Sequence, residues 1–208
     1  RTPVFQIGET YGSPQLINGY LSNGMLDAQF DFNLYDALVA AFTADSADVT
    51  ALIDVANQSI NTYGAHHLMG NITGNQDRPR FTSLADGALD PAEDTKLAGW
   101  TRDIQHNGNV GYRKMSWLMA FLMSSPGIPC IYYGDEIATL NDYSYLKDPE
   151  KHSDNRWLNR PIIDWQHAAK RNQKDTIEHR TFHDLKRMIE IRKRLPEFHN
   201  ENDYQLIE

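Results

Sequence analysis

Short apolar runs alternate along the chain with longer segments in which apolar residues recur every three or four positions. The short runs predict strands at residues 4–8, 28–32, 67–72 and 128–133. The longer segments predict helices around residues 34–42, 49–60, 115–122 and 181–194. Asp48 is expected to cap the second helix, and Pro126-Gly127 to end the third. The stretch 10–23 predicts a polar, Gly-rich loop.

Strand and helix follow each other four times, an order that predicts an α/β fold with right-handed crossovers and a parallel sheet. The run 128–133 is apolar throughout, as expected of a strand that is covered on both faces. The segments after the strands are long and rich in Asn, Asp, Gly and Tyr. Because parallel α/β folds place their sites at the carboxyl ends of the strands, we expect the functional residues in these segments.

The composition narrows the classes of function. With 208 residues the chain can bury one sizeable core, and its net charge of −8 leaves no basic surplus for a general affinity for nucleic acid. Cys130 is the only cysteine in the sequence, so an intrachain disulfide is excluded, and its apolar neighbours predict a buried, inert thiol. No apolar stretch approaches the roughly 20 residues that a membrane helix needs. Neither nucleic-acid nor membrane partners are expected.

Acidic side chains follow three of the four predicted strands. Glu9 comes after the first strand, Asp77 after the third, and Asp135 with Glu136 after the fourth. Carboxylates at the ends of neighbouring strands converge, and glycoside hydrolysis needs two of them, one as acid and one as nucleophile or base. Spacing alone leaves a second interpretation open, in which these residues only cap the loops or helices that follow.

Five strings of residues place this chemistry in a family context: 5–11 (FQIGETY), 27–32 (DAQFDF), 75–80 (NQDRPR), 127–136 (GIPCIYYGDE) and 159–165 (NRPIIDW). The first four resemble, in order, the fifth to eighth strand segments of the α-amylase family (glycoside hydrolase family 13). The last resembles an Arg-x-Pro-Met-x-Trp string of several members. The resemblance implies the second half of a TIM (β/α)8 barrel, with four parallel strands, helices, and long loops at the carboxyl ends of the strands.

The resemblance also implies roles for individual residues. Glu9 would give a proton to the glycosidic oxygen and later activate water as a base, and Asp77 would grip sugar hydroxyls and favour the oxocarbenium-like state. Arg80 lies where the family has an arginine near that aspartate, and a guanidinium there would help to keep Asp77 ionised. The other residues expected to bind substrate are Asn75, Gln76 and Tyr11. Gln76 stands where many relatives have histidine; it keeps a donor but cannot become cationic.

Two further groups of polar residues have a structural interpretation. Asp135 and Glu136 are expected to brace loops by hydrogen bonding rather than to react. His179 and His183 stand four positions apart on a predicted helix, a spacing that can bind a metal. Because the sequence offers no third ligand beside them, we expect a surface pair and no metal site.

The resemblance covers only part of a family member. It implies that residues 1–202 are the second half of the catalytic domain and that residues 203–208 begin a missing C-terminal β domain. The first four strands, and the nucleophilic Asp among them, would then lie outside the chain. No segment of the sequence matches the Gly-Phe-Arg-x-Asp type of nucleophile motif. We therefore expect the fragment to be inactive alone, to need no cofactor, and to self-associate through open sheet edges.

The expected activity of the full-length parent is retaining hydrolysis of α-1,4-linked glucans or maltooligosaccharides, with calcium as a cofactor that the parent could hold. A transglycosylase or isomerase that shares the covalent intermediate stays open, as does a non-catalytic relative that binds carbohydrate or protein. A doubly wound nucleotide-binding protein is excluded because the sequence has no G-x-G-x-x-G turn. The compartment is open, with a periplasmic or secreted location favoured over a cytoplasmic one.

Overall fold

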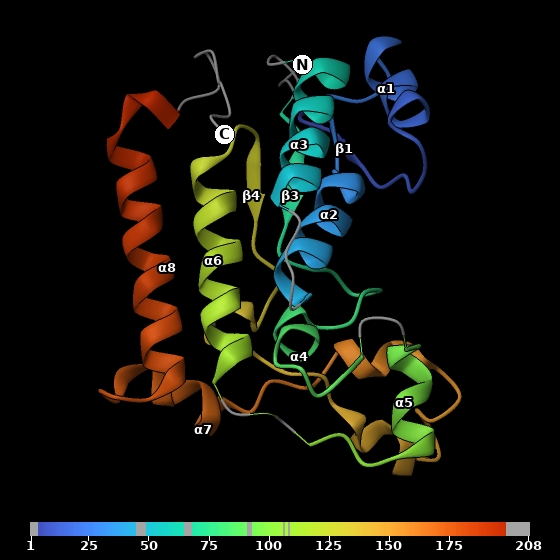
Figure 1. The fold of residues 1–208 in the computed structure, drawn as a ribbon, viewed down its shortest axis with the longest axis vertical. Coiled ribbons are helices and arrows are strands. Elements are labelled where there is room, and N and C mark those ends of the chain that lie inside the picture. The colour runs from blue at the N-terminus through green and yellow to red at the C-terminus, as the bar shows by residue number, and fades with distance from the viewer. Residues whose placement is uncertain are drawn as a thin grey trace.

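The computed structural model describes residues 4–44, 49–64, 68–90, 93–105, 107 and 109–198. The predicted cap Asp48, the first residue of the third predicted strand (His67) and the segment 203–208 lie outside the described residues. Figure 1 shows α8 (Ile177–Arg194) and α6 (Val110–Ser124) side by side along the long axis. The strand β4 (Ile128–Cys130) lies between α6 and the helix pair α2 (Phe32–Thr43) and α3 (Val49–Tyr63).

The strands are short and parallel. β1 (Ile7–Gly8) pairs with β2 (Ala28–Gln29), and β3 (Gly70–Ile72) pairs with β4 (Ile128–Cys130). An isolated parallel bridge between Phe30 and Gly70 joins the two pairs, so neighbouring strands follow the order of the chain. All four predicted strands are present but shorter than expected.

The predicted helices are present as α2, α3, α6 and α8. The Asp31 carboxylate accepts from the Leu34 backbone N–H at 3.0 Å and so caps α2. Thr176 caps α8 in the same way, accepting from the His179 N–H at 3.1 Å. Helix α8 therefore begins at Ile177, four residues before the predicted start.

The prediction of a loop over residues 10–23 is wrong, because helix α1 spans Pro14–Ser22. Ser13 caps it by accepting from the Leu16 N–H at 3.3 Å, and Pro14 supplies a preset φ in its first turn. Ile17 and Leu21 turn inward onto α3 and the start of β3. The remaining short helices are α4 (Phe81–Ala85), α5 (Thr95–Thr101), α7 (Trp165–Ala168) and 3-10 helices at Asp135–Ile137, Tyr143–Lys147, Asn155–Asn159, Ala169–Asn172 and Pro196–Phe198.

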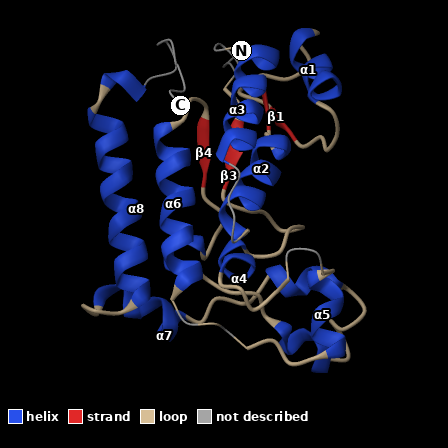
Figure 2. Ribbon diagram, viewed as in Figure 1, coloured by secondary structure: helices blue, strands red, loops and turns tan. Residues whose placement is uncertain are grey.

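The main apolar core lies between α2, α3, α4, α6 and α8, where Leu38, Leu118 and Leu122 are fully buried. The strand β4 is only half-buried, contrary to the expected cover on both faces, because an open groove runs along it towards α8. The Cys130 thiol is likewise half-buried, and this burial raises its pKa. No helix in the described part of the chain is long and apolar enough to cross a membrane. Figure 2 shows loops and short helices, α5 among them, gathered beyond α4.

Candidate active site

Three loops bring the candidate site together. Glu9 directly follows β1, and Asn75 to Asp77 lie in the loop between β3 and α4. The third loop follows β4 and returns at the end of the 3-10 helix Asn155–Asn159. Because the strands are parallel and adjacent, their carboxyl ends deliver these residues to one edge.

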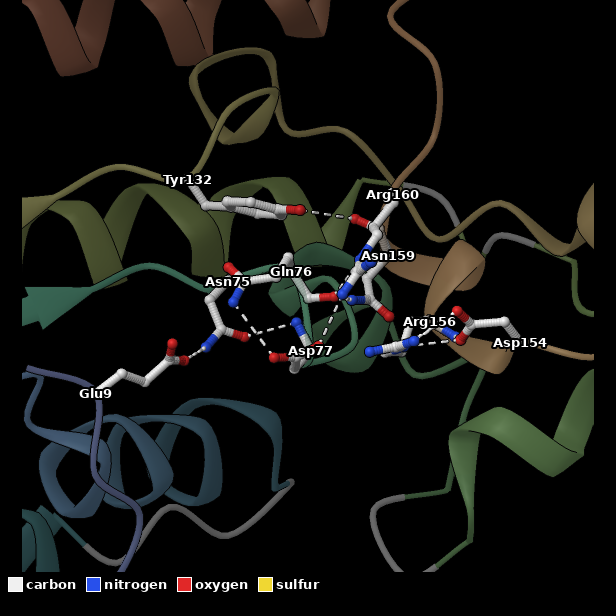
Figure 3. A network of polar contacts seen from close by, with 9 residues as sticks. All are labelled: Glu9, Asn75, Gln76, Asp77, Tyr132, Asp154, Arg156, Asn159 and Arg160. Atoms are coloured by element: carbon white, nitrogen blue, oxygen red, sulfur yellow. Dashed lines mark hydrogen bonds and ion pairs between the residues drawn. The ribbon is translucent and has the colours of Figure 1, made fainter. Parts of the chain in front are cut away.

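Asn75 links the Glu9 carboxylate to the backbone of Asp77 (Figure 3). Its Nδ2 donates to Glu9 Oε1 at 3.2 Å, and its Oδ1 accepts from the Asp77 backbone N–H at 2.9 Å. Glu9 and Asp77 are both exposed, so both face the space from which a substrate would approach. The hydrogen bond between Asn75 and Glu9 joins residues that are 66 positions apart along the chain. It brings together the loops that follow β1 and β3.

The cation beside Asp77 is Arg160, not the predicted Arg80. Arg160 Nη2 donates to Asp77 Oδ1 at 2.9 Å, and the two side chains are 30% and 47% exposed. Gln76 Nε2 lies 3.3 Å from the second carboxylate oxygen of Asp77 and donates to it. Arg160 was missed because it comes 83 residues later, although the string 159–165 had already marked its segment.

Arg80 is buried below the site, with its side chain only 1% exposed. Its Nη1 donates to Asp135 Oδ1 at 2.9 Å and to the Tyr133 carbonyl at 2.6 Å, and its Nε donates to the Asn159 carbonyl at 3.1 Å. The Tyr132 ring centroid lies 4.3 Å from the guanidinium carbon. A side chain enclosed in this way offers no surface to a sugar, which corrects the expectation that Arg80 binds substrate.

Asp135 braces the loops, as the sequence suggested. Besides Arg80, it accepts from the Thr73 hydroxyl at 2.6 Å, and Thr73 in turn accepts from the Tyr132 N–H at 3.0 Å. Burial raises the pKa of Asp135 to about 6, while the Arg80 cation and the Thr73 hydrogen bond oppose that rise. The carboxylate therefore stays ionised at neutral pH and ties the ends of β3 and β4 together.

Asn159 is a residue of this site that the sequence did not single out by role. It is fully buried, and its Nδ2 donates to the Gln76 carbonyl in a close hydrogen bond. Arg160 Nε donates to the same carbonyl at 2.8 Å. The Tyr132 hydroxyl donates to the Asn159 carbonyl at 3.4 Å. Figure 3 shows Asn159 and Arg160 reaching the Gln76–Asp77 peptide from one side and Asn75 from the other.

Tyr11 lies on the rim of this region and is 65% exposed. Its hydroxyl donates to Asp36 Oδ2 at 2.9 Å, and its ring meets Phe32 edge to face at 5.5 Å. The Arg78 guanidinium carbon lies 5.6 Å from the ring centroid and the guanidinium is paired with Asp36. The ring is thus held by fixed partners while most of its surface stays open.

A polar cleft of about 180 Å³ adjoins Arg160. Trp157, Tyr145 and Ile162 are among the residues that line it. At the start of the 3-10 helix Asn155–Asn159, Arg156 donates to both carboxylate oxygens of Asp154. These bonds lower the pKa of Asp154 to about 2. The loop after β4 therefore supplies aromatic, apolar and charged surface beside Asp77.

The described residues contain no group of three or more His, Cys, Asp or Glu side chains that could hold a metal ion. The rings of His179 and His183 lie 4.1 Å apart on α8, and His179 Nδ1 lies 2.8 Å from the Arg171 carbonyl.

Residues 2–188 match the family model of the alpha-amylase catalytic domain. Alpha-amylase 2 of Schizosaccharomyces pombe is 31% identical over 134 residues, which are 64% of this chain and 19% of that protein. Glucosylglycerate phosphorylase of Escherichia coli K12 is 33% identical over 88 residues, 42% of this chain and 15% of that protein. The solved alpha-amylase from Geobacillus thermoleovorans, complexed with acarbose, matches 95% of this chain and 35% of its own with a TM-score of 0.64 and 26% identity. The chain thus spans 15–35% of the length of these relatives.

Proposed function

The chain belongs to the α-amylase family of glycoside hydrolases, and from that premise we propose that it carries the general acid and the stabilising carboxylate of a retaining α-glucan hydrolase. The observation that carries the proposal is the link through Asn75, which holds Glu9 and Asp77 around a single side chain. Glycoside hydrolysis needs an acid and a second carboxylate that acts as nucleophile or base; in this proposal Glu9 is the acid, and Asp77 stabilises the transition state.

In this proposal each carboxylate has a separate task. Glu9, exposed at the end of β1, gives its proton to the glycosidic oxygen as the leaving group departs and then takes a proton from the attacking water. Asp77 accepts hydrogen bonds from sugar hydroxyls and stabilises the positive charge that develops on the ring. Gln76 and Arg160 donate to Asp77 and so fix the direction of its oxygens.

We propose α-1,4-linked glucans or maltooligosaccharides as the substrates. Relatives named as alpha-amylases and a solved alpha-amylase with bound acarbose support this choice. The cleft beside Arg160 supports it too, because Trp157 and Ile162 offer the apolar surface on which the C–H face of a pyranose packs.

The proposed catalytic set within these 208 residues lacks a nucleophile, since no segment matches the family motif that holds it. The covalent intermediate of a retaining enzyme cannot form without that carboxylate. We therefore expect the purified 208-residue polypeptide to release no reducing sugar from starch or maltooligosaccharides. Measurable release would contradict this part of the proposal.

The test of the two roles uses the natural gene product that carries this sequence. Glu9→Gln is expected to lower kcat on maltooligosaccharides about 100- to 10,000-fold, because proton transfer to the leaving group is lost. On a 4-nitrophenyl glycoside the loss should be much smaller, since that leaving group departs without a proton. Asp77→Asn should lower kcat on both substrates to a similar extent. Glu150→Gln, an exposed carboxylate away from the strand ends, is the control.

A transglycosylase or isomerase would use the same intermediate and the same two carboxylates. The phosphorylase among the relatives favours keeping transfer as a second candidate. Product analysis separates the activities, because transfer gives new glycosides or a sugar phosphate when an acceptor is added. A non-catalytic relative would bind maltooligosaccharides without turnover, and Glu9→Gln would then leave binding unchanged.

A further inference from the structure

We propose that Asn159 is a positioning residue, whose buried side chain fixes the Gln76–Asp77 peptide and so sets the place of Asp77. This inference rests on the proposed function of Asp77. It concerns a contact that lies beneath the site, between the loop after β3 and the loop after β4.

The Gln76–Asp77 peptide is held on both sides. Its carbonyl accepts from Asn159 Nδ2 and from Arg160 Nε, which fills both lone pairs of the oxygen. Its N–H donates to Asn75 Oδ1 at 2.9 Å. The peptide plane cannot rotate without breaking hydrogen bonds on both edges, so the Asp77 side chain leaves the backbone in a fixed direction.

Asn159 is itself anchored in the buried network. Its carbonyl accepts from Arg80 Nε at 3.1 Å and from the Tyr132 hydroxyl at 3.4 Å. Arg80 is tied in turn to Asp135, and both of these side chains are at most 2% exposed. Hydrogen bonds in such buried surroundings are electrostatically stronger than in water, so this network anchors the Asn159 backbone firmly.

Arg160 and Asn159 differ in what a substrate would do to them. Arg160 is 30% exposed and touches the Asp77 carboxylate, so a sugar that engages Asp77 competes for that ion pair. Asn159 is 0% exposed and its side chain donates to the Gln76 backbone carbonyl, so its hold persists when the site is filled. Asn159 therefore maintains the place of Asp77 during turnover.

The first experiment compares Asn159→Ala with Asn155→Ala in the natural gene product. Asn155 is exposed at the start of the same 3-10 helix and serves as the matched control. Loss of the donor at Asn159 should lower kcat on maltooligosaccharides about 10- to 100-fold, because small displacements of a catalytic group are costly. KM should change less than threefold, since Asp77 acts chiefly in the transition state. An unchanged kcat, or a rise in KM alone, overturns the proposal.

The pH dependence of kcat in Asn159→Asp distinguishes a positioning role from a purely structural one. A protonated carboxyl can donate to the Gln76 carbonyl, whereas an ionised carboxylate repels it. The kcat of Asn159→Asp relative to the unchanged protein should therefore rise as the pH falls. The corresponding ratio for Asn159→Ala and for Asn155→Asp should stay flat. A flat ratio for Asn159→Asp overturns the proposal.

Melting temperatures and hydrogen exchange separate the remaining outcomes. If Asn159→Ala fails to fold, the comparison rests on Asn159→Asp at low pH. In a folded Asn159→Ala variant, the Asp77 amide should exchange faster while the amides of α6 keep their protection. If the unchanged protein cleaves no α-glucan, the proposed function fails, and the exchange rate of the Asp77 amide still decides the role of Asn159. An unchanged rate overturns it.

Discussion

Asp135 and Arg80 form an ion pair in which the two side chains are 2% and 1% exposed. Arginine does not release its proton at any ordinary pH, so a neutral partner would leave a buried cation. The Thr73 hydroxyl and the Tyr133 carbonyl provide the other partners of the pair. Removing the Asp135 carboxylate from water nevertheless costs more than these partners return, and its pKa is therefore raised to about 6.

That raised pKa predicts a pH-dependent stability. Between the unperturbed value of 3.8 and about 6, the folded chain holds a proton on Asp135 that the unfolded chain has released. Protons taken up on folding add stability, so the contribution of this group is full below 3.8 and is lost as the pH rises through about 6. As the pH falls from 6.5 to 4, the melting temperature of the unchanged protein should rise relative to that of Asp135→Asn. Asp103→Asn is the exposed control, and a constant difference for Asp135→Asn would contradict the raised pKa.

The residue strings led correctly to one place for Glu9, Asn75 and Asp77, since local sequence determines which residues follow a strand. They misplaced Arg80, because the resemblance put it where the family has an arginine near the aspartate. The chain turns inward at this point: Phe81 begins α4 and is fully buried, and Arg80 precedes it on the inner side. The roles of Asn159 and Arg160 depend on contacts across more than 80 positions, which no local pattern specifies.

Helices were predicted more accurately than loops, because α2, α3, α6 and α8 each bury one face at helical spacing. The sequence also contained a start signal for α1 in Ser13-Pro14, but the surrounding polar residues concealed it. The strands were predicted too long, since Val4 and Phe5 are 72% and 52% exposed and have little to pack against. Element ends depend on tertiary contacts that a pattern does not contain.

Arg192 joins α8 to the end of α6 and to the turn before β4, and a substitution can test this contact. From α8 its guanidinium donates to the carbonyls of Met123, Ser125 and Gly127 at 2.8–2.9 Å, and so satisfies the end of α6 and the turn before β4. Lysine cannot reproduce this fork, so Arg192→Lys should cost about 1.5–3 kcal/mol. For a chain of this length the melting temperature should fall by about 3–12 °C. Arg187→Lys, an exposed change on the same helix, should leave it unaltered.

The whole molecule has two outer strands. In the described part of the chain β1 pairs with β2 and β4 pairs with β3, so each outer strand has an open edge. Pro129 blunts the edge of β4, whereas β1 follows the exposed Phe5 and contains the exposed Ile7. The arrangement of four neighbouring parallel strands is compatible with the predicted half-barrel. The half-barrel itself remains a prediction, because a local sequence pattern does not specify pairing between distant strands.

The open edges lead us to expect that the 208-residue polypeptide self-associates. Sedimentation should give an average molecular weight that rises with the protein concentration. Phe5→Lys should shift this rise to higher concentration, because a charge at the β1 edge opposes strand pairing. Ile162→Lys, at an 81% exposed position in the loop after β4, is the control. A monomer at all concentrations with a cooperative melt would contradict the expectation.

The hold of Asn159 on Gln76 joins residues 83 positions apart, and this separation matters while the protein is being made. Ribosomes add about 5–20 residues per second, so Asn159 emerges about 4–17 s after Gln76. During that interval the nascent chain already contains Glu9, Asn75 and Asp77 but not the residue that we propose to fix the place of Asp77. A ribosome that stalls before residue 159 therefore leaves a chain that contains Asp77 without the contact proposed to set its place.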